Sequence, residues 1–162
     1  MLGLGTPHWD YGARSTLLGV TRGTGRPEVV RAVLEGIAQR GTDLVEAAEA
    51  DTGAAIPTLR VDGGMSANPT FLQALADASQ RPVEVSPVAD ATTLGAGFLA
   101  GLAVGVWSDV DDLAAAWRPR TTIAPGPPLD RVRWAEAVER AADQAAVLTV
   151  LFELENSAKA AV

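Results

Sequence analysis

The chain has 162 residues, of which 48% are hydrophobic and 20% are charged, and its formal net charge is −7 at pH 7. This composition is that of a globular protein, and the negative charge argues against a broad nucleic-acid surface, because such a surface needs clustered Lys and Arg. The chain has no Cys, which excludes a disulfide framework and a thiol nucleophile, and its lack of a long apolar run or a signal-peptide pattern predicts no membrane span and a cytoplasmic location.

The first third of the chain predicts a loop, a short strand and a long helix. Glycines and turn formers fill residues 1–14, and the apolar run 16–20 is expected to form a strand. A helix-start signal at Pro27 opens an amphipathic helix over 28–51, which Gly53 is suited to end. The side chains expected to face the core are Val29, Val30, Val33, Ile37, Leu44, Val45 and Ala48.

The middle of the chain alternates short strands with helices. Strands are expected at 58–62 and 82–85, and helices at 69–79 and 92–105, the last capped by Asp90 or Thr92. The inward side chains of the first of these helices are expected to be Phe71, Leu72, Leu75 and Ala76.

The helix predicted over 92–105 is unusually rich in glycine. Each interior glycine costs roughly 1 kcal/mol relative to Ala. The glycines are Gly95, Gly97, Gly101 and Gly105. We expect close backbone packing against a neighbour to compensate for this cost. Packing of a membrane helix dimer through small residues is the competing interpretation, which Thr92, Thr93 and the short apolar length disfavour.

The last part of the chain predicts a short helix from Asp109, a Pro-rich connector over 119–128 and a closing helix from Leu129 to at least Ala146. Residues 1–146 are expected to form one domain, with 147–162 as a divergent tail. Helices that alternate with short strands indicate an α/β layered fold.

The run from Leu59 to Pro69 is the most informative motif of the chain. An alternating apolar stretch ends at Gly63 and Gly64, and Asn68 with Pro69 then forms a helix-start signal. Glycines let a backbone approach a ligand closely, and the free N–H groups of a helix start favour anionic groups. The pattern therefore fits a nucleotide-holding turn. It also fits an ordinary tight turn between a strand and a helix, because a lone Gly-Gly pair is common.

Two other nucleotide-binding arrangements are disfavoured. No Gly-x-x-x-x-Gly-Lys-Ser/Thr run is present, which excludes a P-loop mechanism. A dinucleotide-binding oxidoreductase needs its glycines between a strand and a helix, whereas Gly95 and Gly97 fall inside a predicted helix.

Several separated motifs together resemble the glycerol kinases, members of the FGGY family of carbohydrate kinases. The motifs are Gly3–Asp10, Gly19–Gly23, Arg60–Gly64, Thr93–Gly97, Leu99–Gly105 and Trp107. The family's second signature is also matched at every constrained position, by Ser15, Leu17, Gly19, Val20, Glu28, Val29, Ala32, Val33, Leu34 and Glu35. The resemblance runs from about Gly3 to about Ala141 and covers only the carboxy-terminal third of such a kinase.

The resemblance implies a fold and a binding site. The fold would be the carboxy-terminal part of a ribonuclease H-like lobe of the actin and hexokinase type, with an incomplete sheet, an exposed sheet edge and several packed helices. Gly64 and Asn68 would contact ATP or ADP, Gly63 would shape the same turn, and Mg²⁺ would accompany the nucleotide without an assigned protein ligand. Asp62, at the end of the predicted strand, is expected to fix the loop by hydrogen bonds, with a direct ligand contact as the alternative.

No residue of this chain is assigned a catalytic role or a metal-ligating role. His8, the single histidine, has no partner histidine nearby and is expected to be a partly buried loop residue. By resemblance, the catalytic aspartate and the acceptor-binding residues lie in parts of the kinase that this chain does not contain.

The leading hypothesis is therefore the nucleotide-side portion of an enzyme that transfers the ATP γ-phosphate to a glycerol hydroxyl. This portion is expected to be inactive without the amino-terminal lobe. The alternatives are a non-catalytic domain that binds a nucleotide or only a partner lobe, and a truncated remnant. The expected partners are an adenine nucleotide and either the missing lobe or a second copy of the chain.

Overall fold

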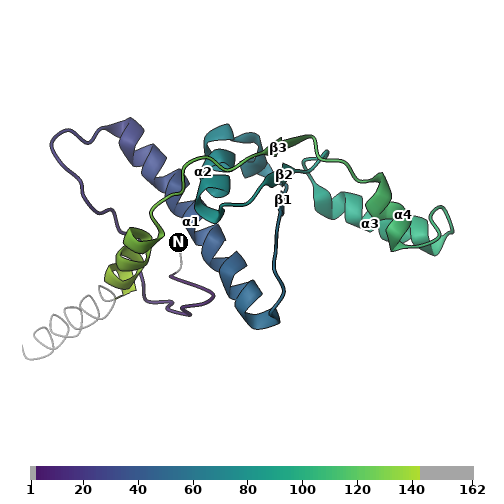
Figure 1. Ribbon diagram of the computed structural model, residues 1–162, viewed down its shortest axis with the longest axis horizontal. Coiled ribbons are helices and arrows are strands. Elements are labelled where there is room, and N and C mark those ends of the chain that lie inside the picture. Colours follow the sequence, from purple (N-terminus) through teal and green to yellow (C-terminus); the bar gives the residue numbers. More distant parts are fainter. Residues whose placement is uncertain (1–2, 143–162) are drawn as a thin grey trace, which may run out of the picture.

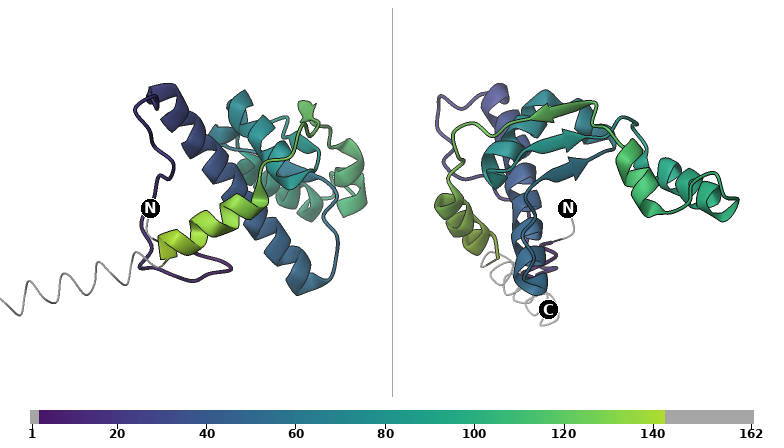
Figure 2. Two further views of the ribbon diagram at one scale, coloured as in Figure 1. Left: turned by 60° about the vertical axis from the view of Figure 1, so that its left-hand side comes forward. Right: turned by 45° about the vertical axis from the view of Figure 1, so that its right-hand side comes forward.

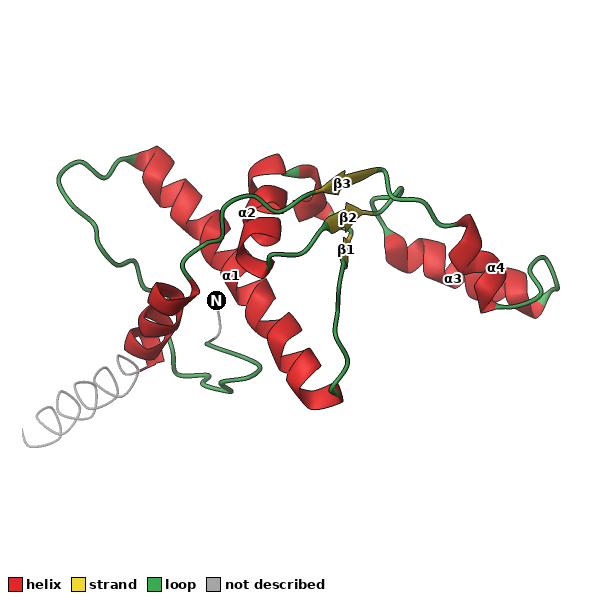
Figure 3. Cartoon of the chain, in the orientation of Figure 1, coloured by secondary structure: helices red, strands yellow, loops and turns green. Residues whose placement is uncertain are grey.

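The computed structural model describes residues 3–142, and these form a mixed α/β arrangement dominated by helices (Figure 3). The elements are α1 (Arg26–Thr52), β1 (Leu59–Val61), the 3₁₀ helix η1 (Gly64–Ala67), α2 (Pro69–Ser79), β2 (Val83–Val85), α3 (Ala91–Ala103), α4 (Val110–Ala116) and β3 (Thr121–Ile123). Residues 131–142 are also helical.

Helix α1 begins and ends as its sequence predicts. The N–H of Gly25 donates to the Glu28 carboxylate at 2.9 Å, and Gly53 takes the left-handed conformation that ends the helix, with φ +67°. The buried face differs from the expected one. The buried residues of α1 are Ala38, Gln39 and Thr42, whereas Val30, Val33 and Leu44 are exposed.

The small residues of α1 explain this difference. Helix α1 packs against α2, and a Cβ built at Gly41 would lie 3.4 Å from Leu75 Cδ1. Close approach of two helices favours a face of small side chains, since bulky ones would hold the axes apart. Val30, Val33 and Leu44 are thus left outside this contact, whereas Val45, also predicted to face the core, is partly buried against it.

The sheet has three strands in the order β1-β2-β3, with β1 and β2 parallel and β2 and β3 antiparallel. Leu59, Val83 and Ile123 are register partners across it and share the face that packs against α2 and α1. Arg60 and Glu84 lie on the opposite face, where they form an ion pair at 3.1 Å. The predicted strands 58–62 and 82–85 are confirmed.

The core is formed by α1, α2 and the sheet, and α2 lies between α1 and the sheet (Figure 1). It joins Ala38 of α1 to Leu72, Leu75 and Ala76 of α2 and to Val83 and Val85 of β2, the last two with no exposed surface. The predicted helix 69–79 and three of its four predicted inward residues are confirmed, and Phe71 is partly buried against the same cluster.

Two predictions about strands are wrong. Residues 16–20 form no strand, and Leu17, Leu18 and Val20 are exposed. A strand requires a neighbouring strand to accept its hydrogen bonds, and the described sheet ends at β1 and β3. Conversely, the connector 119–128 contains strand β3. This strand lies between two prolines of the connector and pairs with β2.

Helices α3 and α4 lie side by side as an arm that projects away from α1 and α2 (Figures 1 and 2). Asp90 caps α3 by accepting from Thr93 N at 3.0 Å. Trp107 packs so closely on Gly101 that a Cβ there would lie 2.0 Å from the ring, and its ring meets Phe98 edge-on, with centroids 5.4 Å apart. The expected close packing therefore holds for Gly101. Gly95 and Gly97 face open space.

The helical segment 131–142 is anchored to α1. Arg131 donates to Asp43 at 2.7 Å and to Glu46 at 2.6 Å, and Trp134 Nε1 donates to the Asp43 carboxylate at 3.0 Å. The start of the predicted closing helix is thereby confirmed. Its end near Ala146, the domain boundary at that residue and the tail 147–162 lie outside the described residues.

Candidate functional site

The Gly63–Gly64 pair forms the turn that follows β1, and Gly63 determines its shape. Its φ of +82° lies in the left-handed region that side-chain-bearing residues rarely adopt. The chain then makes one short turn, η1, in which Ser66 N and Ser66 Oγ both donate to the carbonyl of Gly63, at 3.1 Å and 2.7 Å. The turn from Asp62 to Asn68 is hereafter called the glycine turn.

Asn68 ends the glycine turn and starts α2. Its Oδ1 accepts from Phe71 N at 3.1 Å, and Pro69 occupies the first helical position. The predicted N-cap is confirmed. Because Oδ1 is the acceptor, the Nδ2 group of Asn68 is left as a donor, and it makes no hydrogen bond within residues 3–142.

The glycine turn is accessible from solvent. Gly64 and Met65 are exposed, and Gly63 and Asn68 are partly exposed. A Cβ built at Gly63 or Gly64 would meet nothing within 4 Å. Over the described residues, the N–H groups of Gly64 and Met65 donate no hydrogen bond. The turn therefore offers backbone donors and open space on one side, which is what a closely approaching polar ligand requires.

The glycine turn is tied to the start of α3. Gly63 N donates to Ala89 O at 3.1 Å, and Asp62 Oδ2 accepts from Ala91 N at 3.0 Å. The expectation that Asp62 fixes the loop is confirmed. Next to it, hydrogen bonds from the backbone and hydroxyl of Thr93 hold the pKa of the Asp90 carboxyl below its usual range, which favours its charged form.

A third contact to the turn comes from a residue that sequence reasoning missed. Arg120 Nη2 donates to the carbonyl of Ser66 at 3.3 Å. The two residues lie 54 positions apart in the chain, and no local pattern links them. The pairing of β3 with β2 brings Arg120 to the turn, and this pairing was not predicted from the sequence.

The other candidates give no catalytic centre. His8 lies at the surface, contrary to the expected partial burial, because it sits at the tip of the turn that follows Gly5. Residues 3–142 contain no group of three or more His, Asp or Glu side chains placed to hold a metal ion, and none of their helices is long and apolar enough to cross a membrane.

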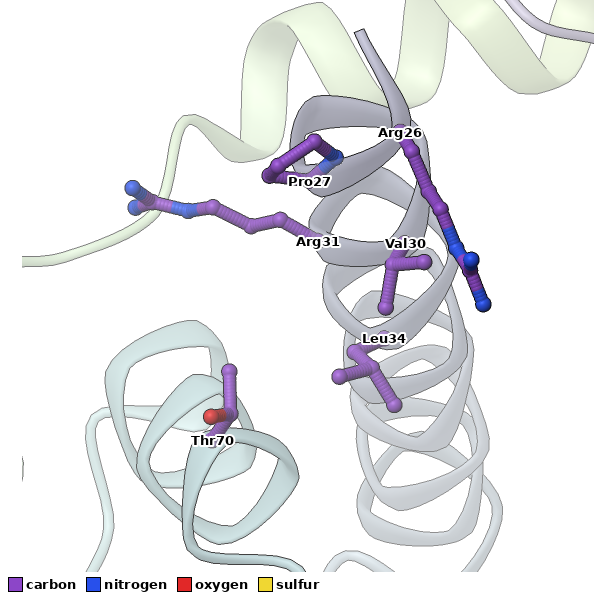
Figure 4. Close-up of a pocket in the computed structure, with 6 residues that line it drawn as sticks. All are labelled: Arg26, Pro27, Val30, Arg31, Leu34 and Thr70. Carbon is purple, nitrogen blue, oxygen red and sulfur yellow. The ribbon is translucent and has the colours of Figure 1, made fainter.

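A separate open groove of about 420 Å³ lies between the start of α1 and the start of α2 (Figure 4). Its lining residues are Arg26, Pro27, Val30, Arg31, Leu34 and Thr70. Arg31 is engaged with Glu35 at 2.6 Å, and none of the three predicted nucleotide-contacting residues lines the groove. The groove therefore lies outside the glycine turn.

Comparison with known proteins places the chain among sugar kinases. The model of the FGGY family of carbohydrate kinases, C-terminal domain, matches residues 1–104. A curated glycerol kinase of Aromatoleum aromaticum is 46% identical over 144 residues, which are 86% of this chain and 29% of that protein. Glycerol kinase 2 of Thermotoga maritima is 44% identical over 144 residues, with the same coverage. The chain thus spans about 29% of the length of these relatives.

Solved structures agree with the sequence relatives. A crystal structure of Plasmodium falciparum glycerol kinase with ADP matches 86% of this chain with a TM-score of 0.75 and 36% identity, and the match covers 29% of that chain. A ligand-bound xylulose kinase of Lactobacillus acidophilus matches 91% of this chain with a TM-score of 0.63 at 23% identity, which supports the fold alone. The predicted fold, part of an actin/hexokinase-type sugar kinase lobe, is confirmed.

Proposed function

We propose that this chain, which belongs to the FGGY family of carbohydrate kinases, is the nucleotide-side portion of a glycerol kinase-like enzyme and binds ADP or ATP at its glycine turn. The observation that carries the proposal is the solvent-accessible Gly63–Gly64 pair, with open space above both glycines and N–H groups at Gly64 and Met65 that donate no hydrogen bond among the described residues. The similar glycerol kinase solved with ADP supports the choice of ligand.

In this proposal, each of the three residues has a separate task. Gly63 gives the turn its left-handed bend, Gly64 leaves room for the nucleotide, and Asn68 donates from Nδ2 while Oδ1 caps α2. The charged carboxylates of Asp62 and Asp90 beside the turn would repel a bare polyphosphate. A nucleotide whose charge is partly neutralised by Mg²⁺ suits such a site better, and we propose that the metal arrives with the nucleotide.

The reaction of the whole enzyme would be transfer of the ATP γ-phosphate to a hydroxyl of glycerol. Phosphoryl transfer needs a base at the acceptor hydroxyl, and no residue of this chain is assigned that task. We therefore propose that the chain by itself is inactive as a kinase. Its proposed location is the cytoplasm, with which a chain lacking Cys is compatible.

We further propose that the rest of a kinase, of the kind that makes up the remaining length of the relatives, packs on the exposed apolar residues of α1 and α3. Val30 and Val33 of α1 and Leu99 of α3 are 50%, 43% and 70% exposed. Exposed aliphatic side chains on neighbouring turns of a helix are typical of an interface. Light scattering, which measures the molar mass of the purified chain in solution, separates this proposal from self-association. Self-association would give a stable dimer.

Calorimetric titration of the chain with Mg²⁺ and ADP tests the binding proposal. Gly64→Val places a branched side chain in the open space without backbone strain, because the φ of Gly64 is not in the left-handed region. Asn68→Asp keeps the acceptor that caps α2 and removes the Nδ2 donor. Both variants should fold as the wild type does and lose ADP binding. Retention of wild-type affinity in both would refute the assignment of the turn.

A further inference from the structure

Arg120 joins the glycine turn to a distant part of the chain. Its backbone N–H donates to Val85 O at 2.8 Å, which fixes its main chain next to the end of β2. From this anchored position its guanidinium reaches the carbonyl of Ser66 at 3.3 Å. The contact therefore connects the edge of the sheet to the middle of the glycine turn.

A contact to Ser66 can restrain the whole glycine turn, because Ser66 is itself bonded to the start of the turn. It is 6% exposed, and both its N–H and its hydroxyl donate to the carbonyl of Gly63. A bond to the carbonyl of Ser66 also restrains the peptide bond between Ser66 and Ala67, and Asn68 is the next residue of the chain. A single side chain can thus restrain the three residues that the proposed function assigns to the nucleotide.

The other two ties of the turn act at its first residues. Asp62 bonds to the first residue of α3 through Ala91 N, and Gly63 bonds to the segment before α3 through Ala89 O. Within the described residues, Arg120 provides the only side-chain hydrogen bond from a distant element to the second half of the turn. Without it, residues 64–67 would rely on bonds within their own short 3₁₀ turn, whose hydrogen-bond geometry is poorer than that of an α-helix.

We propose that Arg120 is a positioning residue that holds the glycine turn in its nucleotide-binding conformation. The proposal rests on the proposed function, since it concerns the same site. Arg120 is exposed as a whole, and the side chain contributes nothing to the core. Its removal should therefore loosen the turn and leave the fold intact.

Hydrogen–deuterium exchange on the full chain without nucleotide tests the positioning directly. In Arg120→Met, the amides of Ser66 and Asn68, which donate to Gly63 O and Met65 O, should exchange about fivefold faster, the size expected for one hydrogen bond. The amides of α2 and β2 should be unchanged. Arg120→Lys, which keeps a cationic donor, should restore part of the protection.

Arg118→Met is the matched control. Among the described residues, the guanidinium of Arg118 donates only to the carbonyls of Ala115 and Trp117, at 2.6 Å and 2.7 Å, at and just beyond the end of α4. This variant should leave the exchange of residues 63–68 unchanged. Unchanged exchange in Arg120→Met, or faster exchange spread evenly over β2 and α2, would overturn the proposal.

Titration with Mg²⁺ and ADP separates this proposal from the proposed function. If the wild type binds, Arg120→Met should bind about fivefold more weakly, Arg118→Met should match the wild type, and equal binding by Arg120→Met despite a looser turn would overturn the positioning role. If the wild type binds no ADP, the proposed function fails, and the exchange experiment still decides whether Arg120 holds the turn.

Discussion

The block formed by α1, α2 and the sheet uses its apolar residues differently from the arm formed by α3 and α4. Helix α2 buries six of its eleven residues. Helix α3 has no charged residue among its thirteen, yet Gly101 is the only one of them that is buried. Both helices have sequences suited to an interior position. The apolar composition of a helix thus indicates that its surface packs against another element. The contacts of the described residues show which of these surfaces are packed within residues 3–142.

The glycines of the arm make the same point. Gly101 is required because Trp107 occupies the space where its Cβ would lie. Gly95 and Gly97 gain nothing from any described neighbour, although each costs roughly 1 kcal/mol in a helix interior. A surface that packs closely on this side of α3 would account for them, which agrees with the proposed docking of the rest of a kinase.

The contrast between block and arm is tested most strongly by truncating one leucine in each. Leu72→Ala in the block, where Leu72 is 4% exposed, should lower the free energy of unfolding by about 2–4 kcal/mol because it leaves a cavity. Leu99→Ala in the arm, where Leu99 is 70% exposed, should change it by less than about 0.5 kcal/mol. Urea unfolding of both variants measures the difference, and similar losses would mean that the arm belongs to the core.

The two glycines of the turn give a smaller, sharper contrast. Gly63→Ala should destabilise the chain by about 1–2 kcal/mol, since its φ of +82° is unfavourable for a residue with a Cβ. Gly64→Ala should leave stability nearly unchanged, because its backbone is ordinary and the added methyl group meets open space. Urea midpoints for the pair check this. Equal destabilisation would show that Gly64 is kept for the fold, not for a ligand.

Acid should weaken the block through a carboxylate at the end of α1. A bond from Ile56 N at 2.6 Å and, to a lesser degree, the nearby Arg81 lower the pKa of Glu49 from its ordinary 4.5. A depressed folded-state pKa contributes stability that is present above pH 4.5 and is lost as the pH falls through the folded-state value. Urea midpoints between pH 7 and pH 3 should therefore fall less in Glu49→Gln than in the wild type.

Asp90 is the corresponding group of the arm. Its pKa is also lowered, chiefly by the N–H and the hydroxyl of Thr93, so protonation should loosen the first turn of α3. Because the arm adds little to the core, Asp90→Asn should leave the acid dependence of the urea midpoint close to that of the wild type. A larger effect of Asp90→Asn than of Glu49→Gln would contradict the division into block and arm.

Local signals in the sequence predicted most of the block. Gly53 marks the end of α1, Asn68 and Pro69 mark the start of α2, and strands β1 and β2 follow from short apolar runs. These features depend on neighbouring residues, so a single sequence is enough to find them. The glycine turn and the capping role of Asn68 were predictable for the same reason.

What the sequence could not predict depends on contacts between distant segments. Strand β3 exists because β2 offers it a partner, although the prolines around it are typical of a connector. The run 16–20 has the residues of a strand but no strand beside it among the described residues. The buried face of α1 is chosen by close approach to α2, and Arg120 reaches Ser66 only after the sheet has formed.

The central claim is that the glycine turn, and not the groove at the start of α1, receives the nucleotide. The most direct measurement is a nitrogen-edited NMR titration of the labelled chain with Mg²⁺ and ADP. We predict that the amide signals of Gly64, Met65 and Asn68 shift most and saturate together, while those of Val30 and Leu34 in the groove stay in place. Shifts centred on the groove, or no shift at the turn at millimolar ADP, would contradict the account.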